Sequence, residues 1–213
     1  MRHRPPHPPR VIARAARAAV ATVAFALLGG CYHGTARAVS AADLEHEAGW
    51  VRVTGVPLIN QSADRDCGAA ALAMVLARWN TPTPPAEIVA AAPVAPDHGI
   101  AAGALRDFAR GKGLRAFLIK GELSDLAREA RANHPVLVGL VQRHGSRATS
   151  HYEVIVGINE GARRVLMLDP ARGMRQDGFD GFQTEWTPSG NLALVVTGPA
   201  SAGPASAGST SAR

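Results

Sequence analysis

The sequence predicts an α+β fold, because helical patterns come first along the chain and an antiparallel sheet follows. Small and apolar residues continue without interruption from Cys67 to Ala77, which is typical of a buried helix that runs to about residue 79. From residue 136 onward the pattern changes to short apolar runs, and residues 159–161 are typical of a tight hairpin turn. These observations predict a helical N-terminal half that packs on an antiparallel sheet.

Start and stop signals define the remaining elements. Pro85 occupies the favoured first position of a helix, Gly113 ends the next helix, and Pro135 closes the one after it. A flexible polar loop is expected at residues 142–150. The predicted helices span residues 67–79, 85–92, 100–112 and 122–133, and the predicted strands span residues 50–59, 115–119, 136–141, 151–158, 163–168 and 192–197.

The N-terminus, residues 1–31, has the layout of a lipoprotein-type signal peptide. An arginine-rich stretch precedes an apolar run over residues 18–30, which is shorter than the roughly 20 residues of a membrane-spanning helix. The run ends in Leu-Gly-Gly-Cys, which resembles a bacterial lipobox and predicts lipid attachment at Cys31. A plain signal peptide cut nearby and an uncleaved anchor are the alternatives.

The expected location is the periplasmic face of the outer membrane. Tyr32 follows Cys31, in place of the Asp that resembles an inner-membrane retention signal. Residues 32–49 are small and polar and are expected to form a tether, and residues 50–198 form the folded domain. Residues 199–213 repeat Pro, Ala, Ser and Gly and are expected to be disordered. We expect a monomer.

The charge distribution argues against a nucleic-acid partner. The net charge is +6, but the first 30 residues contain five arginines and no acidic residue. Without them the net charge falls to about +1, so the folded domain has no basic excess that would attract phosphates.

Cys67 is the one thiol left when Cys31 is set aside, so it has no partner for an internal disulfide. It opens the first predicted helix, where the positive end of the helix dipole favours a thiolate. Cys67 is therefore a candidate nucleophile. The alternative is a buried cysteine that serves as a small apolar residue.

A thiol nucleophile needs a base, a group that orients the base, and donors for the oxyanion. His151 opens a strand after the polar loop, and Asp169 ends the next strand of the same hairpin. Strand pairing would bring the carboxylate near the imidazole, where it could hold the tautomer. Gln61 lies six residues before Cys67, so its amide and the Cys67 backbone N–H could form an oxyanion hole.

Two acidic residues near the thiol are expected to turn away from it. Asp64 and Asp66 would oppose thiolate formation if they faced the sulfur, so they should face solvent or cap the helix. No cofactor and no metal are predicted, since the remaining histidines lack metal-ligand spacing.

Three blocks of sequence stand in this order: Gln61-x5-Cys67-Gly68, His151-Tyr152-x-Val154-x-Val156-Gly157-Ile158, and Leu168-Asp169-Pro170. Together they resemble the bacteriocin-processing, double-glycine-leader peptidases, which are papain-like cysteine peptidases. The resemblance runs from about residue 56 to 196 and implies a papain-like fold and a peptide or protein substrate. It implies Cys67 as nucleophile, His151 as general base and acid, Asp169 as orienting residue and Gln61 as oxyanion donor.

The sequence also departs from that family's best-known members, which stand at the front of an ATP-driven membrane exporter. Here an export signal precedes the domain, and no spanning helices or phosphate-binding loop follow it. We therefore expect an exported thiol peptidase, and cleavage of Gly-Gly leaders stays open. The alternatives are a non-catalytic peptide-binding domain on the same fold and a thiol-dependent amidase or acyltransferase that acts on cell-wall peptide.

Overall fold

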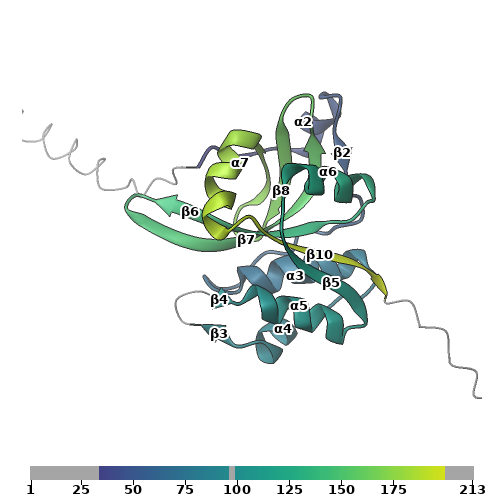
Figure 1. The fold of residues 1–213 in the computed structure, drawn as a ribbon, viewed down its shortest axis with the longest axis vertical. Helices are drawn as coiled ribbons and strands as arrows, with labels where there is room; N and C mark the ends of the chain where they lie inside the picture. Colours follow the sequence, from purple (N-terminus) through teal and green to yellow (C-terminus); the bar gives the residue numbers. More distant parts are fainter. Residues whose placement is uncertain (1–33, 96–98, 200–213) are drawn as a thin grey trace, which may run out of the picture.

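The computed structural model describes residues 34–95 and 99–199. The predicted signal peptide with Cys31 and the tail beyond Pro199 lie outside the described residues. The described chain forms a large antiparallel sheet with helices on both sides (Figure 1), which confirms the α+β prediction.

The central sheet has eight strands in the order β1-β9-β8-β7-β6-β10-β5, and β2 pairs with one end of β7. A separate two-stranded hairpin joins β3 (Val94–Ala95) to β4 (Gly99–Ile100). The strands of the main sheet are β1 (Arg37–Ala38), β2 (Val51–Arg52), β5 (Leu114–Lys120), β6 (Val136–His144), β7 (Arg147–Asn159), β8 (Arg164–Asp169), β9 (Gly173–Gly178) and β10 (Leu192–Pro199).

Helices α3, α4 and α5 lie together on one side of the central strands, and α7 lies on the other side (Figure 1). None of the helices in residues 34–95 and 99–199 combines the length and the apolar character that crossing a bilayer requires. The helices are α2 (Ala41–Glu45), α3 (Cys67–Arg78), α4 (Pro85–Ala91), α5 (Ala102–Gly111), α6 (Leu123–Arg131) and α7 (Phe179–Trp186), followed by a 3₁₀ turn (Thr187–Ser189).

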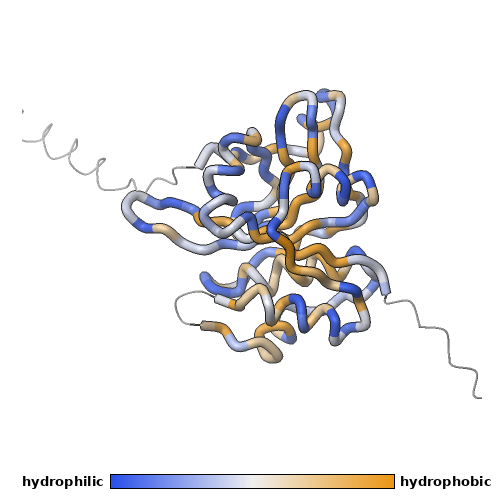
Figure 2. Tube along the Cα trace, in the orientation of Figure 1, coloured by the Kyte–Doolittle hydropathy of each residue, from blue (hydrophilic) through white to orange (hydrophobic). Residues whose placement is uncertain are grey.

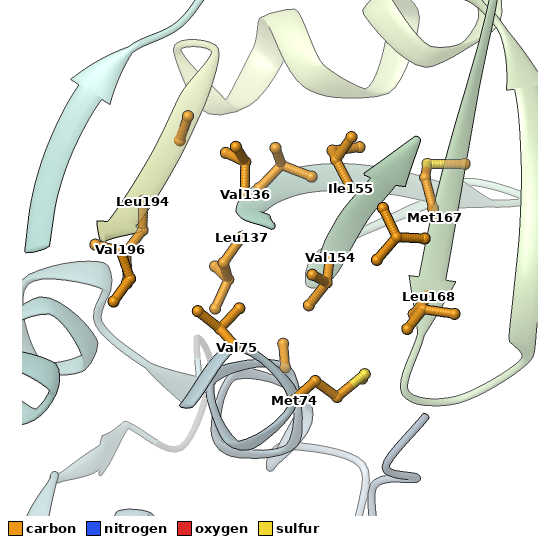
Figure 3. Packing of buried hydrophobic residues seen from close by; sticks show 14 of the residues in the cluster. Met74, Val75, Val136, Leu137, Val154, Ile155, Met167, Leu168, Leu194 and Val196 are labelled. Carbon is orange, nitrogen blue, oxygen red and sulfur yellow. The ribbon is translucent and has the colours of Figure 1, made fainter. Parts of the chain in front are cut away.

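The core forms where α3 meets the sheet. Every residue of α3 from Cys67 to Leu76 is buried, and the run of alanines lets the helix approach the strands closely. Figure 3 shows Met74 and Val75 of α3 pointing toward Leu137 of β6 and Val154 of β7. The apolar stretches of the chain converge at this layer (Figure 2). The first residue of α3 is therefore fixed by a well-packed helix.

Three parts of the fold differ from the sequence prediction. Residues 142–150 are not a flexible loop, because β6 and β7 pair from Val136↔Ile155 out to His144↔Arg147. Strand β9 and helix α7 were not predicted. The segment expected as a tether contains β1 and α2, and β1 pairs with β9 at the sheet edge.

Candidate active site

The loop before α3 is held by Asp66. Its carboxylate accepts hydrogen bonds from the backbone N–H of Ser62 at 3.0 Å, the hydroxyl of Ser62 at 2.6 Å and the N–H of Ala63 at 3.1 Å. Burial disfavours the ionised carboxylate, but these bonds outweigh it and lower the pKa of Asp66. The expectation that Asp66 faces solvent or caps the helix is wrong, because the side chain is buried and bonds back into its own loop.

Cys67 is the first residue of α3 and is 6% exposed. His151 of β7 lies near enough to Cys67 for the thiol to contribute to the raised pKa of the imidazole. The next residue is a glycine because the helix and strand are close: a Cβ on Gly68 would lie 3.1 Å from Tyr152 Cδ2 and 3.3 Å from Leu105 Cδ1. The helix therefore approaches β7 closely at the residues that follow the thiol and the imidazole in sequence.

His151 and Asp169 come together because β7 pairs with β8. The register Val154↔Leu168 places Asp169 at the end of β8 beside His151, and His151 Nε2 lies 2.8 Å from Asp169 Oδ1. Burial opposes the charged imidazole, but the hydrogen bonds to Asp169 and Cys67 outweigh it and raise the pKa of His151 to about 10. Burial also opposes ionisation of Asp169, yet the bond to His151 holds the pKa of Asp169 below its ordinary value. These contacts favour the protonated form of His151 beside the Asp169 carboxylate and the Cys67 thiol.

Gln61 lies on the loop before α3, but its side chain bonds locally. Its Nε2 donates to the carbonyl oxygen of Ala63 at 3.0 Å, and its Oε1 is buried without a hydrogen-bond partner. Its backbone N–H donates to the carbonyl oxygen of Pro170 at 2.9 Å, which links the loop to the turn after Asp169. The role predicted for the Gln61 amide stays a prediction.

A second carboxyl group, Glu153, lies behind the His151–Asp169 pair. Three atoms lie within 4.8 Å of one another: a ring nitrogen of His151 and one carboxylate oxygen each of Glu153 and Asp169. Gln142 Nε2 donates to Glu153 Oε1 at 2.8 Å, and Glu153 Oε2 is buried without a hydrogen-bond partner. Burial, together with the nearby charge of Asp169, raises the pKa of Glu153 to about 7.

The second oxygen of Asp169 faces arginine. Arg175 Nη1 on β9 lies 3.3 Å from Asp169 Oδ2, and Arg172 Nη1 lies 3.8 Å from the same oxygen. Sequence reasoning missed Glu153 and Arg175. Glu153 could have been found, because residues two apart on a strand share a face with each other. Arg175 carries no local signal, since its contact depends on the pairing of β8 with β9.

Two hollows flank the loop before Cys67, and Ser62 and Ala63 line both. One, of about 670 Å³, lies between this loop and residues 170–173 and includes Gln61. The other, of about 520 Å³, lies between the loop and α4, and its lining combines small apolar side chains such as Val89 with Arg65 and Asp66.

A buried thiol at the start of a central helix, opposite a histidine on an antiparallel sheet, defines the class of papain-like cysteine peptidase folds. The chain belongs to the Peptidase C39 family, whose model matches residues 55–200. It is 38% identical over 116 residues to an uncharacterized protein of Methanothermobacter thermautotrophicus, covering 54% of this chain and 72% of that protein.

Solved structures show the same fold. A double glycine motif protease from an AMS/PCAT transporter, solved in complex with the leader peptide, aligns with a TM-score of 0.57 at 26% identity. The alignment covers 70% of this chain and 94% of that one. The peptidase domain of Streptococcus ComA, a bi-functional ABC transporter involved in a quorum sensing pathway, aligns with a TM-score of 0.57 at 24% identity, covering 67% and 98%. The predicted family and papain-like fold are confirmed.

Proposed function

We propose that this chain is an exported thiol peptidase that hydrolyses peptide bonds through Cys67, His151 and Asp169. The observation that carries the proposal is the contact of His151 Nε2 with Asp169 Oδ1 at 2.8 Å, beside a Cys67 thiol that helps to raise the pKa of the same imidazole. Membership of a cysteine peptidase family and the solved complex of a related protease with its leader peptide support a peptide substrate.

In the proposed reaction, the Cys67 thiolate attacks the carbonyl carbon of the scissile bond while His151 holds the proton as imidazolium. The collapse of the tetrahedral intermediate forms a thioester, and His151 gives its proton to the leaving amine. His151 then removes a proton from water, which attacks the thioester and releases the acid. Asp169 accepts from Nε2 throughout and keeps the other ring nitrogen facing the thiol.

We assign the oxyanion to two donors on the same loop and helix start. The backbone N–H of Cys67 belongs to the first turn of α3, where N–H groups have no partner within the helix. The amide nitrogen of Gln61 keeps a second hydrogen that its bond to Ala63 does not use. Removal of one oxyanion donor typically lowers the rate by about 10²–10³.

We also propose that the protein is exported and lipid-anchored through Cys31. The support is the arginine-rich stretch, the short apolar run and the Leu-Gly-Gly-Cys sequence that ends it. On this proposal the substrate is a peptide or protein outside the cytoplasm, and the two hollows beside Ser62 and Ala63 receive it. Metabolic labelling with a fatty acid, in wild type and Cys31→Ala, tests the anchor; equal labelling would refute it.

The first experiment measures whether the thiol is activated. Iodoacetamide should alkylate Cys67 in the folded protein at about pH 6, where an ordinary thiol with a pKa of about 8.5 is almost unreactive. His151→Gln should remove this reactivity. His134→Gln is the matched control, because His134 also contacts a carboxylate, Glu129 at 3.0 Å, on another part of the domain. Ordinary reactivity in the wild type would overturn the proposal.

The second experiment asks whether the activated thiol cuts proteins. A proteome-wide survey of protein N-termini should show cleavage products in wild-type cells that disappear in Cys67→Ala cells. An activated thiol with no change in N-termini would favour transfer to, or hydrolysis of, a non-protein amide. An unreactive thiol with an intact cellular role in Cys67→Ala would favour a non-catalytic binding domain.

A further inference from the structure

Arg175 connects Asp169 to the N-terminal segment of the domain. One arm of its guanidinium, Nη1, contacts Asp169 Oδ2 at 3.3 Å, and the other arm, Nη2, donates to the carbonyl oxygen of Ala36. Asp169 is 0% exposed and Arg175 is 5% exposed. Since Asp169 Oδ1 faces His151, the two carboxylate oxygens have different partners, and Arg175 holds the one that His151 does not.

The surroundings make this contact important for the position of Asp169. The other guanidinium near Oδ2 belongs to Arg172, which is more distant at 3.8 Å and is 31% exposed at its side chain. A buried carboxylate needs a paired charge and hydrogen-bonded oxygens, because an unpaired buried oxygen loses its hydration without a replacement. Other charged groups near this pair include His151 and Glu153 on β7, Glu185 on α7 and Asp177 on β9.

The N-terminal segment that contacts Arg175, residues 35–38, packs closely against β9 and α7. Strand β1 pairs with β9 in the register Ala38↔Arg175, and Thr35 Oγ1 donates to Asp177 Oδ1 at 2.6 Å. A Cβ built on Gly181 of α7 would overlap Thr35 Oγ1 and would lie 2.7 Å from Asp177 Oδ1. Only a glycine at this position of α7 leaves room for the segment as it lies here.

We propose that Arg175 is a positioning residue of the candidate active site, and that residues 35–38 hold its guanidinium in place. On this inference, which rests on the proposed function, the N-terminal segment is a structural part of the catalytic arrangement. The fork of Arg175 ties the Ala36 carbonyl to Asp169, and Asp169 in turn orients His151 toward Cys67.

The expected effect of losing Arg175 has a defined sign. Without Nη1, Asp169 Oδ2 is a buried carboxylate oxygen with its nearest guanidinium partner gone. Asp169 then either takes up a proton or turns away from its present place, and both outcomes remove the acceptor that stabilises the imidazolium of His151. Iodoacetamide alkylation of Cys67 at about pH 6 should therefore slow by about tenfold or more in Arg175→Met, and approach the wild-type rate near pH 9.

A double-mutant cycle in the full chain separates positioning from a general structural role. Arg175→Met is measured alone and together with Asp169→Asn, with alkylation rates taken across the pH range. If Arg175 acts through Asp169, the substitution slows alkylation in the wild-type background and adds little in the Asp169→Asn background. Equal slowing in both backgrounds would refute the proposal. If Arg175→Met does not fold, Arg175→Lys, which keeps the charge, is used in its place. Its alkylation rates are then compared with and without Asp169→Asn.

A second pair of variants tests the N-terminal segment without touching Asp169 or Arg175. Gly181→Ala should displace Thr35 and slow alkylation at about pH 6 in the same direction as Arg175→Met. Gly103→Ala on α5 is the matched control, since it adds the same methyl to a helix where nothing lies within 4 Å. It should leave alkylation unchanged.

The outcomes separate this inference from the proposed function. A wild-type thiol with ordinary reactivity removes the proposed function itself. If the wild-type thiol is activated and Gly181→Ala shows the same pH profile of alkylation, residues 35–38 do not hold Arg175 in place. An activated wild-type thiol that is unaffected by Arg175→Met excludes Arg175 as a positioning residue.

Discussion

Asp66 closes the loop that delivers the thiol by accepting hydrogen bonds from both the backbone N–H and the hydroxyl of Ser62, at 3.0 and 2.6 Å. The residue directly before Cys67 is thus a buried acid whose carboxylate bonds into the preceding turn. This explains how an acidic residue can stand beside a candidate nucleophile. Three donors of the loop form hydrogen bonds to its carboxylate.

Asp66→Ala should loosen this loop and destabilise the domain by about 1–3 kcal/mol, because three donors lose their acceptor. Urea unfolding at neutral pH measures the loss. The pKa of Asp66 is lowered in the folded state. Its contribution is therefore present above about pH 3.8 and is lost as pH falls through the folded value. Ser62→Ala keeps the acid and should cost less. Equal stability of Asp66→Ala and wild type would contradict this role.

Gln61→Ala should separate thiol activation from oxyanion stabilisation. Alkylation by iodoacetamide forms no oxyanion, so its rate should stay at the wild-type value. Hydrolysis of a peptide identified in the survey of N-termini should slow by about 10²–10³. Single-turnover cleavage measures the second quantity. Slowing of both reactions to the same degree would indicate that Gln61 shapes the loop and does not bind the oxyanion.

Glu153→Gln should change how stability depends on pH. Burial raises the pKa of Glu153 to about 7 from an ordinary value of 4.5, so the folded state holds this proton more tightly than the unfolded state. Its contribution favours folding below about pH 4.5 and is lost as pH rises from there to about 7. Thermal unfolding between pH 4.5 and 8 should show this loss in the wild type but not in Glu153→Gln. Asp64→Asn, at an exposed acid, is the control. Parallel curves for wild type and Glu153→Gln would refute the assignment.

Gly68→Ala should reduce reactivity more than stability. The added methyl would press on Tyr152, the neighbour of His151, at 3.1 Å, while alanine favours the helix by up to about 1 kcal/mol. Alkylation at about pH 6 should fall several-fold with a small change in melting temperature. Gly111→Ala at the end of α5 has open space and should not affect alkylation. Unchanged reactivity in Gly68→Ala would show that the ring can yield.

The sequence predicts α3, α4, α5 and α6 well because each of these helices has a clear start or stop. Pro85 begins α4, and α5 ends just before Gly113, at positions that local chemistry defines. The segment Gly173–Gly178 has no apolar alternation, so β9 forms only because β8 and β1 pair with it. Helix α7 is short and contains Gly181, whose packing reason lies in a distant segment. Tertiary pairing overrides weak local preference in these elements.

The contacts of the candidate site also differ in whether the sequence predicts them. The contact between His151 and Asp169 follows from two predicted strands of one hairpin, so pairing alone brings them together. The contacts of Arg175 depend on β9 and on β1, neither of which local pattern predicts. The local bond of Gln61 to Ala63 could not be foreseen either, because loop side-chain orientation depends on the whole turn.

The docking of Thr35 on the sheet edge limits how far the domain could stand from a lipid attached at Cys31. Four residues of fully extended chain span at most about 14 Å. On the proposed anchoring, the edge formed by β1 and β9 would therefore rest against the bilayer surface, with little freedom to swing away from it. The protein would then act on chains that pass along the membrane face, and it would do so in one preferred orientation.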